Sequence, residues 1–184
     1  MIPVGNGVDA ITFGDGALWV TNTVTDTLVK IDPQTNAVTA RISVGNSPEA
    51  IAVGGGSVWV ANTLDNSVWR IDESSGRVVS RITVLAPPTS LALYGNALWV
   101  ASQTGNTLSK VDTTTGTIAT TVPVGAQPAA IVAGPGGVWL VADAARDVER
   151  IDPARGTVIA RLKVEGAPEG IAMDATRVWV SVQR

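Results

Sequence analysis

The sequence of 184 residues contains no histidine and no cysteine, and each absence removes a class of chemistry. Without Cys there is no disulfide framework, no thiolate nucleophile and no zinc finger. Without His, the Ser-His-Asp and Cys-His arrangements and every His-ligated metal site are excluded. Charge is also scarce, because charged residues are 16% of the chain and the net charge is only −3. No basic patch is present, so we expect no nucleic-acid partner.

Long apolar runs and helical periodicity are missing as well. Pro, Gly, Thr, Ser and Gln interrupt the two low-charge stretches, 82–109 and 113–142, so neither is a continuous membrane span. The first residues have neither a basic n-region nor an apolar h-region, so we expect no signal peptide. No window shows the periodicity of an amphipathic helix. The sequence therefore predicts an all-β chain without a membrane span.

What the chain does contain is a repeat of 40 residues without any insertion. Four independent markers keep this spacing: a Trp followed by Val or Leu, an Ile or Val followed by Asp, a Gly or Asn in a turn, and a Pro. Their positions are Trp19, Trp59, Trp99, Trp139 and Trp179; Asp32, Asp72, Asp112 and Asp152; Asn36, Gly76, Gly116 and Gly156; Pro48, Pro88, Pro128 and Pro168. Repeats of this length indicate a modular architecture.

Each repeat contains four short strand-like runs separated by turn residues. In the second repeat the runs 49–53, 57–61, 67–71 and 77–82 are separated by Gly, Asn and Asp, which tolerate the positive φ of tight hairpins. Four antiparallel strands in 40 residues are typical of a β-propeller blade. We predict a β-propeller rather than a β-solenoid, whose coils are usually shorter and contain less hairpin chemistry.

The sequence does not decide whether the blades close into a ring, because 24 residues remain after four repeats of 40. We expect one propeller array over residues 1–184, with repeats 1–40, 41–80, 81–120 and 121–160 and a partial fifth at 161–184. In one interpretation, residues 1–4 form a strand that pairs beside residues 178–182 and closes a five-bladed ring. In the other, the chain is a piece of a larger propeller. An open array would expose sheet edges and favour self-association.

The repeat also resembles a known group of proteins. The pattern VGxxPxxIAxGxxxVWVxNxxxxxVxRIDxxxG stands nearly whole between Val44 and Gly76. It resembles the YVTN-type bacterial propeller repeat and is similar to the repeats of NHL propellers and streptogramin lyases. The resemblance implies a propeller scaffold, often outside the cytoplasm. Streptogramin lyases use a catalytic His and a magnesium ion, and this chain has no His, so no catalytic residue carries over.

Most of the repeated residues are predicted to be structural. The five register Trp residues could form a ligand cage, but burying each Trp removes about 200 Å² of apolar surface from water, which favours packing between blades. The repeated Asp residues are expected to accept backbone N–H groups across their turns. The repeated basic residues Lys30, Arg70, Lys110 and Arg150 are expected to be solvated. Trp69 is outside the register, so it is the better candidate for a ligand contact.

The position that opens the first strand of each repeat is the main candidate site. It holds Asp9, Glu49 and Glu169 in three repeats, and these carboxylates become neighbours if five repeats close. Crowded carboxylates raise one another's pKa or attract a cation. Asn22, Asn62, Gln103 and Asp143, from the adjacent loops, could add oxygen ligands. Such a donor set would suit Ca²⁺ or Mg²⁺ and not zinc; the alternative is a solvated acidic rim.

These observations leave three interpretations of the function open. The first is a non-catalytic propeller that binds a protein partner or a small ligand at the face carrying Asp9, Glu49 and Glu169. The second is a lyase or hydrolase that uses the same carboxylates with a divalent ion, which the absence of His disfavours. A fragment without an activity of its own is the third interpretation.

Overall fold

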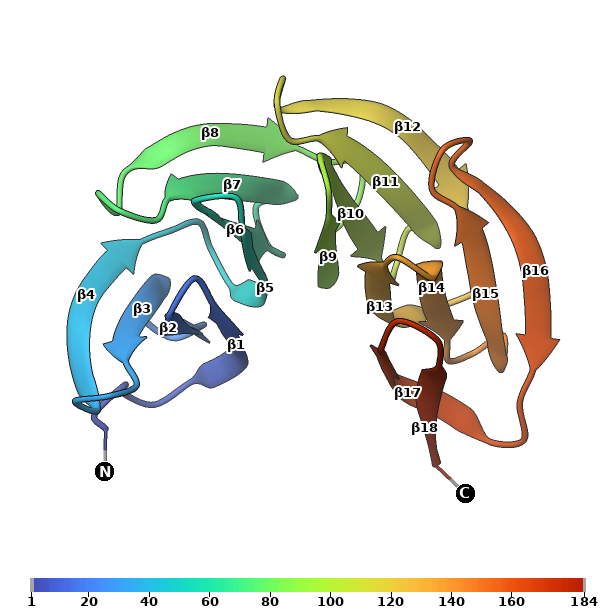
Figure 1. Ribbon diagram of the computed structural model, residues 1–184, viewed down its shortest axis with the longest axis horizontal. Coiled ribbons are helices and arrows are strands. Elements are labelled where there is room, and N and C mark those ends of the chain that lie inside the picture. The colour runs from blue at the N-terminus through green and yellow to red at the C-terminus, as the bar shows by residue number, and fades with distance from the viewer. Residues whose placement is uncertain (1, 184) are drawn as a thin grey trace. The chain divides into compact units, whose positions relative to one another are not determined.

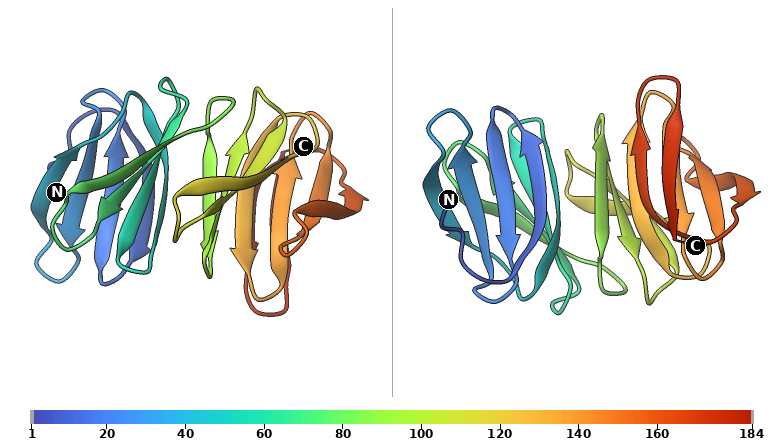
Figure 2. Two further views of the ribbon diagram at one scale, coloured as in Figure 1. Left: turned by 90° about the horizontal axis from the view of Figure 1, so that it is seen from above. Right: turned by 90° about the horizontal axis from the view of Figure 1, so that it is seen from below.

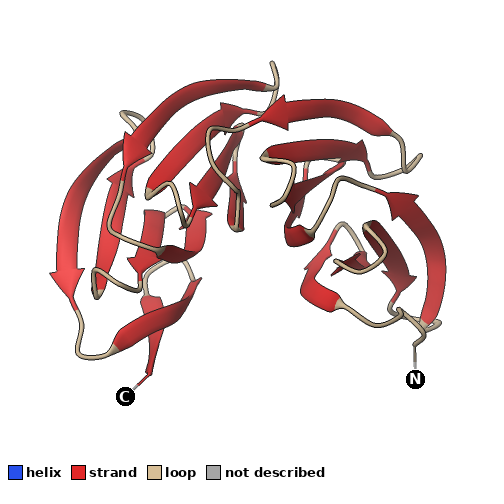
Figure 3. Ribbon diagram, turned by 180° about the vertical axis from the view of Figure 1, so that it is seen from behind, coloured by secondary structure: helices blue, strands red, loops and turns tan. Residues whose placement is uncertain are grey.

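The computed structural model describes residues 2–183, and every regular element among them is a β-strand (Figure 3). No helix in this range has the length and apolar character needed to cross a membrane. The strands are β1 Val8–Gly14, β2 Ala17–Asn22, β3 Thr27–Asp32, β4 Ala37–Ser43, β5 Pro48–Gly54, β6 Ser57–Asn62, β7 Ser67–Asp72, β8 Val78–Thr83, β9 Ser90–Tyr94, β10 Ala97–Ser102, β11 Thr107–Asp112, β12 Thr117–Pro123, β13 Pro128–Gly134, β14 Gly137–Ala142, β15 Asp147–Asp152, β16 Thr157–Lys163, β17 Ala167–Met173 and β18 Val178–Gln183.

The strands form four four-stranded antiparallel sheets and one two-stranded sheet. In each sheet the strands follow one another in chain order, and the hairpins alternate between its two ends (Figures 1 and 2). We call β1–β4, β5–β8, β9–β12 and β13–β16 blades 1 to 4, and β17–β18 the partial blade 5. Four complete blades and a partial fifth are what the sequence predicts, and the prediction is confirmed.

The chain divides into two compact units, the first ending at Pro88 and the second beginning at Thr89. The N-terminal unit contains blades 1 and 2, and the C-terminal unit contains blades 3, 4 and 5. Each unit is described below by itself. The prediction of a single array over 1–184, and of its ring closure, stays a prediction.

The hairpin turns explain why this sequence forms blades. The Gly or Asn that marks the turn in each repeat adopts a left-handed backbone conformation in each complete blade. The φ angle is 56° at Asn36, 66° at Gly76, 71° at Gly116 and 67° at Gly156. Gly and Asn adopt this conformation with little strain. The β3–β4 type of hairpin is therefore encoded locally, once in each repeat.

Within each unit the core lies between blades, where a register Trp of one blade packs against the sheet that follows it. In the N-terminal unit, Trp19 of blade 1 packs in one cluster with Val58, Val60 and Ile71 of blade 2. In the C-terminal unit, Trp99 of blade 3 packs with residues of blade 4, including Val138 and Leu140. Apolar side chains between two sheets lose most of their contact with water, which is the main favourable contribution to folding.

The prediction that all five register Trp residues are core is correct for three of them. Trp19, Trp59 and Trp99 are 0–1% exposed, and Trp139 is half-buried. Trp179, however, is 49% exposed. The reason is its place in the array: within residues 2–183 no later sheet covers the face of β18 on which Trp179 lies.

The N-terminal segment also differs from the expectation. Residue 1 lies outside the described residues, and Ile2 and Val4 belong to no strand. Instead, both side chains pack against Val20, Val29 and Ile31 of blade 1. The Asn22 Nδ2 group donates to the Val4 carbonyl at 3.1 Å, which fixes the segment to its own blade.

Candidate functional site

The first strand of several blades carries a β-bulge where the sequence predicts the site. In blade 2, Pro48 pairs with Asn62 and Ala50 with Ala61, so Glu49 is an additional residue with no partner. Blade 5 repeats this pattern at Glu169, and blade 1 has an irregular register between Val8 and Ile11, which includes Asp9. Bulges redirect side chains and are frequent beside functional sites. The candidate carboxylates therefore occupy the irregular position of their strands.

Asp9 and Glu49 lie on neighbouring strands of the N-terminal unit. Strands β1 and β5 contact each other and lie side by side in Figure 1. Asp9 is exposed, whereas Glu49 is half-buried and its Oε1 accepts from the Ser47 hydroxyl at 3.3 Å. Glu169 is exposed in the C-terminal unit. Among residues 2–183, no three acidic side chains form a group that could hold a metal ion, so the cation site stays a prediction.

The amide side chains predicted beside these carboxylates have structural contacts. Asn22 is buried, and its Oδ1 accepts the backbone N–H of Val24 at 3.1 Å and of Thr25 at 3.0 Å. Asn62 is also buried, and its Nδ2 donates to the Ser67 hydroxyl at 3.4 Å. Asn22 thus closes the β2–β3 turn, as Asn side chains commonly do.

Gln103 is half-buried in the β10–β11 turn, where its backbone carbonyl accepts the N–H of Asn106 at 3.4 Å. The neighbouring Asn106 shows a role that the sequence reasoning missed. Its Oδ1 accepts the N–H of Gln127, in the loop that leads to the next blade, at 2.8 Å. In blade 1, Asp26 Oδ1 accepts the N–H of Ser47 in the same way at 2.9 Å. Asp26 and Asn106 both have positive φ. An Asn or Asp in such a turn is the feature of the sequence that could have indicated this role.

Trp69, the candidate contact residue outside the register, is half-buried and packs against the core cluster of blades 1 and 2. The Arg81 guanidinium lies 4.2 Å from its ring centroid. The two residues are direct partners on β7 and β8. A cation over an aromatic face stabilises both groups. Arg81 therefore covers Trp69 on one side, and its role as a ligand contact stays a prediction.

The same pair of positions is occupied by matched partners in blades 3 and 4. In blade 3, Ser109 and Thr121 share a hydrogen bond of 2.8 Å between their hydroxyls. In blade 4, Glu149 pairs with Arg161, and two residues earlier on the strand Asp147 pairs with Lys163 at 3.3 Å. Glu149 is 0% exposed, so the Arg161 charge compensates for the removal of its carboxylate from water.

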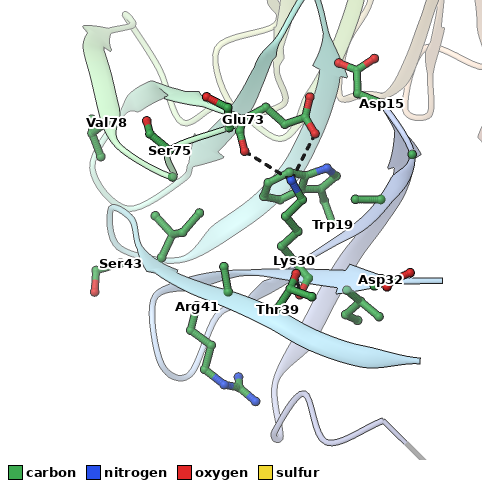
Figure 4. Close-up of a pocket in the computed structure, with 17 residues that line it drawn as sticks. Asp15, Trp19, Lys30, Asp32, Thr39, Arg41, Ser43, Glu73, Ser75 and Val78 are labelled. Carbon is green, nitrogen blue, oxygen red and sulfur yellow. Dashed lines mark hydrogen bonds and ion pairs between the residues drawn. The ribbon is translucent and has the colours of Figure 1, made fainter. Parts of the chain in front are cut away.

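Figure 4 shows a pocket of about 880 Å³ in the N-terminal unit, between blades 1 and 2. At its base the Lys30 ammonium lies 4.9 Å from the centroid of the Trp19 ring. The same ammonium contacts Glu73 of blade 2, at 3.3 Å from Oε1 and 3.4 Å from the carbonyl oxygen. Arg41, on the pocket wall, donates to the Pro3 carbonyl at 2.6 Å. The cations that line this pocket are therefore engaged in holding blade 1 to its neighbours.

A basic side chain over the register Trp is a general feature of the repeat. The expectation that these residues are solvated holds for Arg150, which is exposed, whereas Lys30, Arg70 and Lys110 are half-buried. Each of these Lys or Arg residues pairs with the register Trp of its own blade on the adjacent strand. The distances from the cation to the ring centroid are 5.3 Å for Arg70, 5.5 Å for Lys110 and 5.3 Å for Arg150. Lys110 also donates to the Pro153 carbonyl of the next blade at 2.6 Å. In blades 1 and 3 the Trp and the Lys thus both contact the next blade of the same unit.

The repeated Asp residues close their turns as the sequence predicts. Asp32 accepts the N–H of Gln34 at 2.8 Å, and Asp112 and Asp152 each accept two backbone N–H groups in the same turn. These bonds hold the pKa of each carboxyl below its usual range. At Asp72 the hydroxyls of Ser75 and Ser74 and the Ser75 N–H lower the pKa to about 2.

Comparisons with known proteins establish the fold. The sequence matches no protein-family model and no curated protein. The structure, however, is similar to Kuenenia stuttgartiensis hydrazine synthase, with 21% identity and a TM-score of 0.82 over 93% of this chain and 54% of that chain. It is also similar to the WD40 domain of Neurospora crassa Pan2 (13% identity, TM-score 0.82, 97% of this chain and 58% of that chain). The fold is a β-propeller fold.

A further propeller structure, that of U3-55K, matches at 10% identity with a TM-score of 0.83, over 92% of this chain and 56% of that chain. The chain thus spans little more than half the length of each structure it matches. At these identities the likeness shows the fold alone, and propellers serve as scaffolds and binding modules for many functions. Neither the geometry nor the comparisons support the metal-dependent lyase or hydrolase alternative.

The lowered pKa of Asp72 predicts a stability that depends on pH. Because the folded pKa is about 2 against an ordinary 3.8, Asp72 stabilises the folded state above pH 4, and this contribution is lost as the pH falls through about 2. We expect Asp72→Asn to lower the free energy of unfolding at neutral pH, with a difference that shrinks toward pH 2. Urea denaturation across this range measures it, and a difference independent of pH would contradict it.

The Glu149–Arg161 pair predicts that its two members are coupled. We expect Arg161→Thr to destabilise the chain by about 1–3 kcal/mol, because it leaves a buried carboxylate without its cation while Arg161 itself is half exposed. The double variant Glu149→Ser/Arg161→Thr recreates the Ser109 and Thr121 pair of blade 3, so we expect it to be more stable than the single variant. Urea denaturation compares the two, and additive losses would contradict the coupling.

Proposed function

We propose that this chain is a non-catalytic β-propeller binding module, which receives a protein partner or a small ligand at the bulge of the first strands: at Asp9 and Glu49 in the N-terminal unit, and at Glu169 in the C-terminal unit. One observation supports this site above the others. The carboxylates of Asp9 and Glu169 are exposed and form no hydrogen bond or ion pair with another described residue. Their capacity to bind is therefore fully available to a ligand.

The other repeated polar residues lack this freedom. Asp32 and its equivalents accept the backbone N–H groups of their own turns, and Lys30 and Lys110 contact the next blade. A blade needs these residues to fold, whatever its ligand. In contrast, the bulge position holds Asp, Glu and Ala in blades 1, 2 and 4, and all three blades keep the irregular register, so a carboxylate is not needed there to form the blade.

The chemistry of the site favours a ligand with a cationic group. Exposed carboxylates offer only acceptor oxygens, and a guanidinium or ammonium group matches them in charge and in hydrogen bonding. The net charge of −3 favours the approach of a cation as well. The ligand class we propose is therefore a Lys- or Arg-bearing segment of a protein, or a small molecule with an amine.

Within the propellers, we assign the chain to the YVTN type. The support for this assignment is the repeat between Val44 and Gly76. It contains Trp59 with Arg70 above its ring, and the turn that a hydrogen bond from the Gly76 N–H to the Asp72 carbonyl closes. The YVTN-type resemblance is also the basis for placing this module outside the cytoplasm.

The proposed site can be tested with a matched pair of substitutions on one strand. Asp9 and Asp15 are both exposed and lie at opposite ends of β1, so Asp9→Asn and Asp15→Asn remove the same charge from different places. With a short Arg-rich peptide as probe, we expect Asp9→Asn and Glu49→Gln to raise the Kd about two- to fivefold. Asp15→Asn should leave the Kd unchanged. NMR titration of the ¹⁵N-labelled chain measures both affinity and location, and equal effects of Asp9→Asn and Asp15→Asn would contradict the site.

Metal addition and removal test the competing use of the same carboxylates. In the proposed module they bind a ligand directly, so we expect the melting temperature to be the same in Ca²⁺, in Mg²⁺ and in EDTA. A resident metal at saturating concentration would raise it by several degrees. A rise in Ca²⁺ or Mg²⁺ that Glu49→Gln abolishes would replace our proposal with a cation site.

A further inference from the structure

Two exposed aliphatic side chains stand beside the proposed carboxylates of the N-terminal unit. Val24, in the β2–β3 turn, is 71% exposed, and Leu64, in the β6–β7 turn, is 77% exposed. They occupy the same position of the repeat, 40 residues apart. The two complete blades of the C-terminal unit hold Thr104 and Ala144 at this position, so the large aliphatic side chains distinguish the N-terminal unit.

The connector between blades 1 and 2 binds both of these turns. The Val44 N–H donates to the carbonyl of Asp26, in the β2–β3 turn, at 3.0 Å. Asn46 contacts the β6–β7 turn: its carbonyl accepts the Leu64 N–H at 3.3 Å. The backbone N–H and the side-chain amide of Asn46 also donate to the Asp65 carboxylate, at 2.8 and 2.7 Å. The two turns, with their aliphatic side chains, are therefore held against one short segment.

Asp9 and Glu49 border the same turns. A Cβ added to Gly7 would collide with the Val24 side chain, so Val24 lies over the segment that leads to Asp9. Glu49 follows the connector, and its Oε1 accepts from the hydroxyl of Ser47 in that connector. The aliphatic side chains and the carboxylates thus form one surface, which we call the turn surface; it consists of Asp9, Val24, Asp26, Glu49, Leu64 and Asp65.

The chain segments of the turn surface bring acidic charge without basic charge. Residues 5–9, 22–26, 44–49 and 62–66 contain four acidic residues and no Lys or Arg. The groups that donate to Asp26 and Asp65 are backbone N–H groups and an amide, which leave the negative charge of both carboxylates in place. Complementarity of charge therefore favours a partner that brings cations.

A buried acceptor under the turn surface has the same preference. Asn62 is 0% exposed, and its Oδ1 has no hydrogen-bond partner within residues 2–183. A Cβ added to Gly45 would meet Asn62 Cγ at 2.7 Å and Asp65 Oδ2 at 2.5 Å, so the amide and the carboxylate pack against the same glycine. The unpaired carbonyl oxygen of Asn62 adds partial negative charge close to the Asp65 carboxylate.

We infer that the turn surface binds a protein segment in which large apolar residues are interspersed among Lys or Arg residues. This inference rests on the proposed function, and it narrows the ligand from any molecule with an amine to an amphipathic basic segment. The cations of the segment meet the carboxylates, while its apolar side chains cover Val24 and Leu64 and remove them from water. Because these two residues belong to different blades, an extended segment can touch both, whereas a small amine cannot.

Two peptides with the same number of Arg residues test this inference, one with Leu and the other with Ser between the Arg residues. NMR titration of the ¹⁵N-labelled 184-residue chain measures the Kd of each. We expect the Leu peptide to bind about five- to tenfold more tightly than the Ser peptide. Equal affinities would overturn the inference and leave the proposed carboxylate site standing, and a failure of both peptides to bind would overturn both.

Substitutions in the two turns locate the apolar contact. The double variant Val24→Thr/Leu64→Thr places in both turns the residue type that blade 3 holds there as Thr104, so we expect the turns to form. This variant should lose the preference for the Leu peptide and keep its Kd for the Ser peptide. Val79→Thr is the matched control, because Val79 is 56% exposed on β8 of the same unit, outside the turn surface, and it should change neither Kd. A preference that survives in the double variant would overturn the inference.

Discussion

The packing of a tryptophan from one blade against the next sheet of the same unit is the contact on which the rest of each unit depends. Trp19 and Trp99 fill the space between two sheets, and the strand beside each Trp places a Lys over its ring. That cation reaches a turn of the following blade, Glu73 in one case and Pro153 in the other. An apolar contact, a cation–π contact and a polar contact thus act at the same place, and the 40-residue spacing keeps them in register.

This dependence explains which parts of the structure the sequence predicts. The four strands, their hairpins and the Asp turns are specified within a few residues, so Asp32 and Asn36 suffice to predict a turn that the structure contains. The buried state of Trp19 was also predictable, because a Trp that recurs on a strand in fixed register is rarely exposed five times. The exposure of Trp179 was not, since it depends on the presence of a covering sheet and not on the local sequence.

The candidate site was predictable as a position and not as a geometry. The sequence identifies Asp9, Glu49 and Glu169 at one place in the repeat, and the register of the strands adds that this place is a bulge. The sequence does not show which side chains contact each other across neighbouring strands. The sequence predicts Trp69 as a candidate contact residue, but it does not indicate the partner Arg81, which lies twelve residues later on another strand. The sequence also predicts Asn22 as an oxygen ligand, and it does not indicate that two backbone N–H groups donate to its Oδ1.

The matched partners on the third and fourth strands have a consequence for recombining blades. One pair of facing positions on the third and fourth strands holds three chemically different pairs of side chains. They are Trp69 with Arg81, Ser109 with Thr121, and Glu149 with Arg161. An exchange of whole repeats keeps both members of each pair together. A designer who joins the third strand of blade 4 to the fourth strand of blade 3 would place the buried Glu149 opposite Thr121, with no cation to balance it. The natural boundary for a crossover in this chain therefore lies between blades and not within them.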